Sequence, residues 1–138
     1  MVQHDTMALM ARILLIEDDE LIQRMYQQVL AMRGHQIVLA DNGEEGLVQA
    51  GASKPDLILL DIMMPRLNGI DMLKKLRTIH GVSKTPVMIL TNLMGAADAQ
   101  ATLDAGALKY VIKSDYTPQE VADIVDDLLK HIHPAKKS

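Results

Sequence analysis

The stretch Leu57-Ile58-Leu59-Leu60-Asp61 decides the fold, because four consecutive apolar residues end abruptly in a carboxylate. A short run that is apolar on both faces is typical of a central strand in a parallel sheet. A carboxylate is costly to bury inside such a strand, so Asp61 should emerge where the strand ends. The run 13–16 (Ile-Leu-Leu-Ile) ends in the same way, in the acidic residues 17–19 (Glu-Asp-Asp). We therefore expect two strands to deliver carboxylates to one edge of a sheet.

Strand-like and helix-like patterns alternate five times along the chain. This alternation predicts an α/β fold, a (βα)₅ doubly wound parallel sheet with the flavodoxin-like strand order 2-1-3-4-5. That order places the first and third strands side by side, at the point of the sheet where ligands bind. The expected strands are 13–16, 37–40, 57–60, 87–90 and 110–112, and the expected helices are 20–32, 42–51, 70–79, 96–105 and 118–129.

Helix faces and helix ends are also predicted from local patterns. An apolar stripe of helical spacing marks the buried face expected for helix 20–32, at Ile22, Met25, Val29 and Met32. The helix that begins near Ile70 is expected to continue to the glycine at position 81. Residues 117–120 (Thr-Pro-Gln-Glu) form a capping box that should start the last helix.

Size, charge and composition narrow the possible classes. With 138 residues and a net charge of −4, the chain is long enough for one domain and has no basic run to bind nucleic acid directly. It has no cysteine, and its longest apolar runs are far shorter than the roughly 18 residues of a membrane span. We expect an N-terminal extension over 1–11, a folded domain over 12–131 and a polar tail over 132–138. A cytoplasmic location without membrane insertion is the default expectation.

Two more polar residues end apolar strands on the edge that carries the carboxylates. Thr91 follows 87–90, and Lys113 follows 110–112. Crowding Glu17, Asp18 and Asp61 together should raise at least one of their pKa values unless a cation lies among them. Mg²⁺ suits such a site, because it prefers oxygen ligands and binds through one or two carboxylates.

This set of residues resembles the receiver domain of two-component response regulators, over residues 12–131. The resemblance rests on Glu17-Asp18, on the segment 61–69 (Asp-Ile-Met-Met-Pro-Arg-Leu-Asn-Gly), and on Thr91, Tyr110 and Lys113 in this order. It implies that Asp61 accepts a phosphoryl group from the phosphohistidine of a sensor histidine kinase or of a histidine phosphotransfer protein. The output would be altered binding to a downstream protein target.

The resemblance also implies roles for the other residues of the site. Glu17, Asp18, Asp61 and the backbone carbonyl of Met63 would hold Mg²⁺. Lys113 and Thr91 would bind oxygens of the phosphoryl group. Tyr110 would be the aromatic switch residue that is coupled to Thr91.

Among the departures from the family pattern, two lie directly after Thr91 and Lys113. Ser114 follows Lys113 where the family usually has proline, and Asn92 follows Thr91 where a small residue is usual. The loop after the fifth strand is therefore expected to be less rigid. Asn92 bears on the width of the opening through which the phosphoryl group enters.

Two other classes of protein remain as alternatives. One is an enzyme, a small Mg²⁺-dependent phosphatase or phosphotransferase that forms an aspartyl phosphate; such enzymes need a cap over the substrate, for which 138 residues leave no room. The other is a pseudo-receiver that only binds partners, against which the intact acidic set argues. Each residue alone also has an ordinary explanation, for example acidic first-turn residues that favour a helix. The favoured prediction is a phospho-switch whose catalysis is limited to its own phosphorylation and dephosphorylation.

Overall fold

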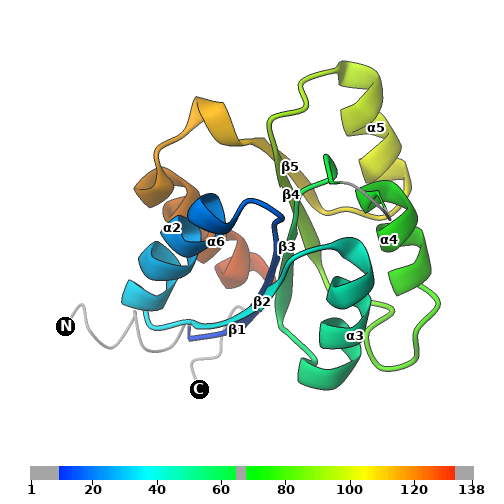
Figure 1. The fold of residues 1–138 in the computed structure, drawn as a ribbon, viewed down its shortest axis with the longest axis horizontal. Helices are drawn as coiled ribbons and strands as arrows, with labels where there is room; N and C mark the ends of the chain where they lie inside the picture. The colour runs from blue at the N-terminus through cyan, green and yellow to red at the C-terminus, as the bar shows by residue number, and fades with distance from the viewer. Residues whose placement is uncertain (1–9, 65–67, 133–138) are drawn as a thin grey trace.

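The computed structural model describes residues 10–64 and 68–132, and this part of the chain contains a five-stranded parallel sheet (Figure 1). The strand order is β2-β1-β3-β4-β5, which confirms the predicted topology. Ile16 pairs with Leu60 in the register of β1 and β3, so the residues that follow them leave the sheet side by side. The strands are β1 (Arg12–Ile16), β2 (Gln36–Ala40), β3 (Leu57–Leu60), β4 (Val87–Thr91) and β5 (Lys109–Ile112).

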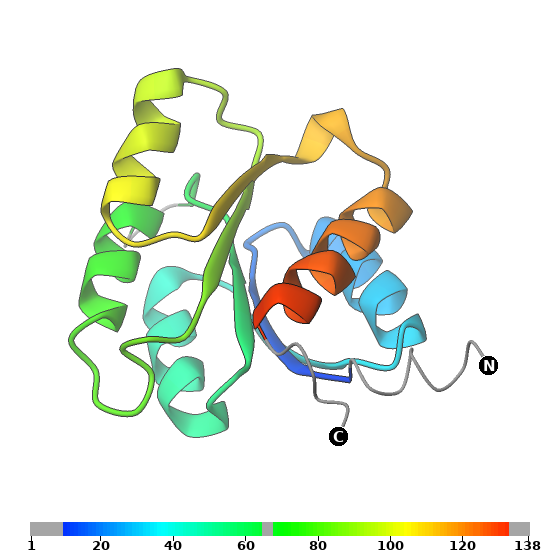
Figure 2. The ribbon, with the colours of Figure 1, turned by 180° about the vertical axis from the view of Figure 1, so that it is seen from behind.

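Helices cover both faces of the sheet (Figures 1 and 2). Helices α2 (Glu20–Met32) and α6 (Pro118–Ile132) lie on one face. On the other face lie α3 (Gly43–Ser53), α4 (Gly69–Leu76) and α5 (Ala96–Asp104). Because successive side chains of a strand point to opposite faces, the central strands feed two apolar clusters. Along β3, Ile58 and Leu60 pack toward α3–α5, and Leu57 and Leu59 pack toward α2 and α6.

The buried face predicted for α2 is confirmed at Ile22 and Val29, which pack against the core, and is wrong at Met25 and Met32. Met25 and Met32 are exposed, and the fully buried positions are Gln23, Tyr26 and Leu30. The amide of Gln23 can lie in the interior because it donates to the backbone carbonyls of Glu17 and Ala40, at 3.1 and 3.3 Å. The buried face of α2 therefore includes a polar residue, Gln23, whose amide has partners in the interior.

The predicted end of α4 is also wrong, since the helix stops at Leu76 and tight turns lead on to residue 81. Ile79 donates its backbone N–H to the carbonyl of Leu76 at 3.1 Å, a three-residue step in place of the helical four. The guanidinium of Arg77 binds three carbonyl oxygens of later segments and so ties the chain back; they belong to Ser83, Thr85 and Gly106.

The capping box that starts α6 is confirmed. Thr117 donates its N–H to the Glu120 carboxylate, and Glu120 donates its N–H to the Thr117 hydroxyl oxygen. Most of the expected extension over 1–11 and of the tail over 132–138 lies outside the described residues. Among the helices of the described part, none is long and apolar enough to cross a membrane.

Candidate functional site

The site lies at the carboxyl ends of β1, β3, β4 and β5, as the sequence predicts. The backbone N–H of Asp61 donates to the carbonyl of Ile16, and that of Glu17 donates to the carbonyl of Ala40, both at 3.1 Å. The backbone hydrogen bonds of the sheet therefore continue as far as Glu17 and Asp61 and fix the backbone at both residues.

Three carboxylates converge at this edge. Oxygens of Glu17, Asp18 and Asp61 lie within 4.8 Å of one another. Glu17 and Asp61 are buried, with 2% and 6% of their surface exposed, whereas Asp18 is exposed to solvent. These are the three residues that the sequence predicts to converge, and the donor set is one that suits a hard divalent cation.

Lys113 lies between the two buried carboxylates. Its ammonium donates to Glu17 Oε1 at 2.5 Å and to Asp61 Oδ2 at 2.8 Å. Burial alone would lower the pKa of Lys113, but these two bonds and the charges behind them raise it above the ordinary value. Lys113 is thus held as a cation in the centre of the site.

The pKa of Glu17 is raised above its ordinary value, as expected for at least one acid of the cluster. The chief cause is burial of the carboxylate, and repulsion by Asp61 contributes least among the causes. The ammonium of Lys113 and the backbone N–H of Asp19 oppose the rise. Desolvation rather than crowding therefore explains most of the effect.

Both oxygens of Asp61 accept hydrogen bonds. Oδ1 accepts from the Thr91 hydroxyl at 2.8 Å and from the backbone N–H of Met63 at 2.9 Å, and Oδ2 is the oxygen that binds Lys113. Thr91 and Lys113 lie at the edge where the sequence predicts them, and both contact Asp61 directly. For Met63 the structure shows a bond through the N–H, and the role of its carbonyl as a metal ligand stays a prediction.

Tyr110 is linked to Thr91 through the backbone of Leu93. The Leu93 N–H donates to the Thr91 hydroxyl oxygen at 3.3 Å, and the Tyr110 hydroxyl donates to the Leu93 carbonyl at 2.5 Å. The side chain of Leu93 gave no sign of this role, because only its backbone takes part. A continuous chain of contacts therefore leads from Asp61 to the half-buried Tyr110 on the edge strand β5.

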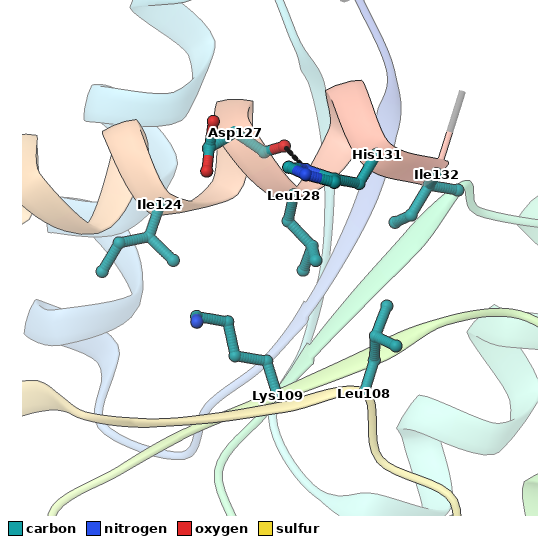
Figure 3. Close-up of a pocket in the computed structure, with 7 residues that line it drawn as sticks. All are labelled: Leu108, Lys109, Ile124, Asp127, Leu128, His131 and Ile132. Atoms are coloured by element: carbon teal, nitrogen blue, oxygen red, sulfur yellow. Dashed lines mark hydrogen bonds between the residues drawn. The ribbon is translucent and has the colours of Figure 1, made fainter. Parts of the chain in front are cut away.

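A groove of about 610 Å³ lies at the opposite end of β5 from the carboxylates (Figure 3). Lys109, the first residue of that strand, and Leu108, which precedes it, face α6 across the groove. The groove is separate from the acidic site, and no sequence motif points to a function there. Its α6 wall consists of Ile124, Asp127, Leu128, His131 and Ile132.

Comparison with known proteins agrees with this fold and site. A family model described as the response regulator receiver domain matches residues 13–126. The alkaline phosphatase synthesis transcriptional regulatory protein PhoP of Bacillus subtilis is 35% identical over 127 residues, 92% of this chain and 52% of that protein. A gliding motility regulatory protein of Myxococcus xanthus is 32% identical over 85% of this chain and 15% of its own length. The chain thus spans about half, or less, of these relatives.

Solved structures give the same result. The receiver domain of the Francisella response regulator 1452 superimposes with a TM-score of 0.78 at 30% identity, covering 88% of this chain and 98% of that one. Vibrio cholerae chemotaxis protein CheY4 gives a TM-score of 0.79 at 25% identity, over 86% and 98%. The fold and the acidic edge define a phosphoryl-accepting class of α/β domain. The chain belongs to the receiver domain family of two-component response regulators.

Proposed function

We propose that Asp61 accepts a phosphoryl group from a phosphohistidine and that the resulting acyl phosphate switches the binding of a downstream protein. The observation that carries this proposal is the environment of Asp61. Its carboxylate is buried at a strand end, and Lys113, Thr91 and the Met63 N–H supply the donors that a phosphoryl group needs. Receivers of this family act with sensor kinases and effectors, and the particular partners of this chain are part of the proposal.

The acidic cluster fits the Mg²⁺ ion that is typical of the family. Asp18 and Asp61 would hold the ion with Glu17 and the Met63 carbonyl. When bound, Mg²⁺ neutralises charge on the phosphoryl oxygens. Asp18 is the exposed member of the set, so it is the carboxylate that an ion from solvent meets first.

The transfer is a displacement at phosphorus. A carboxylate oxygen of Asp61 forms the new P–O bond while the P–N bond to the donor imidazole breaks, and the electron pair of that bond stays on the imidazole nitrogen. Lys113 already contacts Asp61 and neutralises charge that the phosphoryl group brings. The reaction thus needs positioning and charge neutralisation rather than a further catalytic base.

The same arrangement favours a switch over a phosphatase acting on small substrates. Of the two carboxylates that converge on Asp61, Glu17 is bound by Lys113 and Asp18 is exposed to solvent. In the proposed site Glu17 is thus engaged by the lysine and Asp18 by the metal ion, so neither is free to protonate a leaving group. We propose the cytoplasm as the compartment, because the ATP that feeds histidine kinases is found there.

Incubation with Mg²⁺ and a small phosphodonor such as acetyl phosphate tests the assignment. We expect one phosphoryl group per chain by intact mass, and reductive trapping followed by peptide mapping should find it on Asp61. Asp61→Asn should take up none. Asp19→Asn is the matched control, since asparagine also caps α2 and uptake should be normal. A label on Asp18 or Asp19 would refute the assignment, and rapid release of phosphate with turnover would favour the phosphatase.

Thr91→Ala should separate phosphorylation from the response to it. Asp61 keeps Lys113 and should still be phosphorylated, within about ten-fold of the wild-type rate. The chain of contacts from Asp61 to Tyr110 loses the Thr91 hydroxyl, its first link. The structural response to phosphorylation beyond Asp61 should therefore largely disappear. The measurement is amide hydrogen exchange over 91–113 with and without beryllofluoride. Thr78→Ala removes an exposed hydroxyl on the other side of the molecule and should respond normally. A full response in Thr91→Ala would show that the signal takes another route.

A further inference from the structure

The loops that follow β4 and β5 are joined by one hydrogen bond. The side-chain Oδ1 of Asn92 accepts the backbone N–H of Ser114 at 2.9 Å. Asn92 directly follows Thr91, and Ser114 directly follows Lys113. The bond therefore lies immediately beside Thr91 and Lys113. These two residues donate to different carboxylate oxygens of Asp61.

The N–H of Ser114 has no other partner among the described residues. It belongs to the first turn of the 3₁₀ helix η1 (Lys113–Asp115), whose N-cap residue Ile112 makes no side-chain capping bond. N–H groups of a first turn have no acceptor within their own helix. Asn92 supplies this acceptor from a different loop, 22 residues away in the chain.

The two departures from the family pattern match each other physically. Proline, the residue usual at position 114, has no N–H and could not make this bond. A small residue, usual at position 92, has no amide oxygen to accept it. Asparagine at 92 thus has its bonding partner only because position 114 is not proline.

We infer that Asn92 is a positioning residue that holds the Thr91 and Lys113 loops together as one unit. The inference rests on the proposed phosphorylation of Asp61. With the bond in place, the hydroxyl and the ammonium are ordered relative to each other before a phosphoryl group arrives, so less ordering remains for the transfer step. The bond replaces, by a contact between loops, the rigidity that proline would give to the loop after β5.

Two substitutions break the bond from opposite sides. Asn92→Leu keeps the bulk of the side chain and removes the acceptor. Ser114→Pro removes the donor and leaves Asn92 intact, whereas Ser114→Ala keeps the N–H and is the matched control. Asn92→Asp keeps an acceptor oxygen and should restore the contact. If Ser114→Pro does not fold, Asn92→Leu alone tests the inference.

With acetyl phosphate at saturating Mg²⁺, Asn92→Leu and Ser114→Pro should each lower the maximal rate of phosphorylation by about five-fold, the effect of one ordinary hydrogen bond. The donor concentration at half-maximal rate and the affinity for Mg²⁺ should stay within about two-fold, because the carboxylates are unchanged. The double variant should be no slower than either single one, since both remove the same contact. Ser114→Ala should behave as wild type.

Amide exchange of Ser114 in the unphosphorylated protein tests the contact independently of phosphorylation. Protection should fall by about five-fold in Asn92→Leu and return in Asn92→Asp. Unchanged protection in Asn92→Leu, a wild-type rate in both single variants, or additive losses in the double variant would each overturn the inference. If wild type takes up no phosphoryl group, the proposed function fails, and the positioning role that depends on it fails too, even where the exchange data confirm the contact.

Discussion

Asp18→Ala should bind Mg²⁺ at least about 100-fold more weakly than wild type and should take up almost no phosphoryl group. Loss of groups that only support a metal ligand already costs 10- to 100-fold in affinity, and Asp18 is itself one of the three converging carboxylates. Without the ion, the charges on Asp61 and on the phosphoryl group repel each other. Titration of Mg²⁺ by calorimetry and phosphorylation by acetyl phosphate are the two measurements.

The fold should survive this substitution. Asp18 is exposed, and its removal relieves repulsion with the two buried carboxylates, so the free energy of unfolding without metal should not decrease by more than about 0.5 kcal/mol. Glu20→Ala is the control, because Glu20 is exposed and pairs with Arg24 along α2. It should bind Mg²⁺ like wild type. An unchanged Mg²⁺ titration of Asp18→Ala would show that the ion binds elsewhere.

The topology and the membership of the site could be predicted from the sequence. The run 57–60 is apolar on both faces and ends in Asp61, and a buried parallel strand is the arrangement that satisfies both features. Parallel strands present their carboxyl ends at one edge, so residues at strand ends converge without any knowledge of contacts. For this reason Thr91 and Lys113 were placed correctly relative to Asp61.

The structural features that the sequence predicts wrongly, or does not predict, depend on contacts between segments. Gln23 is buried because carbonyls at the ends of β1 and β2 accept its amide, and α4 stops early because Arg77 finds acceptors in later segments. The links through Leu93 and between Asn92 and Ser114 each join a side chain to a backbone group, and nearly all residue types carry such backbone groups. Hydrophobic periodicity contains no information about such bonds.

The ammonium of Lys113 provides positive charge beside Glu17 and Asp61, where a bound metal ion would also be stabilising. It is the cation that contacts Glu17 and Asp61 together, so without metal these two buried acids depend on it for charge neutralisation. The lysine therefore contributes to stability before phosphorylation and to charge neutralisation during it. A substitution of Lys113 should accordingly change stability, pH dependence and metal linkage at the same time.

Lys113→Met should lower the free energy of unfolding by about 3 kcal/mol at neutral pH without metal. Methionine fills a similar volume but leaves Glu17 and Asp61 buried and unpaired, and removing one partner of a buried ion pair typically costs about 3–5 kcal/mol. Urea denaturation of wild type and variant measures the difference. Lys109→Met, on the same strand but exposed, should change stability by no more than about 0.5 kcal/mol.

The loss should depend on pH and on metal in a defined direction. The pKa of Lys113 is raised above 10.5, so its contribution to stability is complete at neutral pH and is lost as the pH rises above 10.5. In the variant, the pKa of Glu17 loses the lysine that held it down and should rise further above 4.5. The folded variant then binds a proton more tightly than the unfolded chain, so its stability should fall as the pH rises above about 4.5. Mg²⁺ should stabilise the variant more than wild type, because the ion restores the missing positive charge. Equal stability of Lys113→Met and wild type at pH 8 without metal would show that Glu17 and Asp61 do not need the lysine.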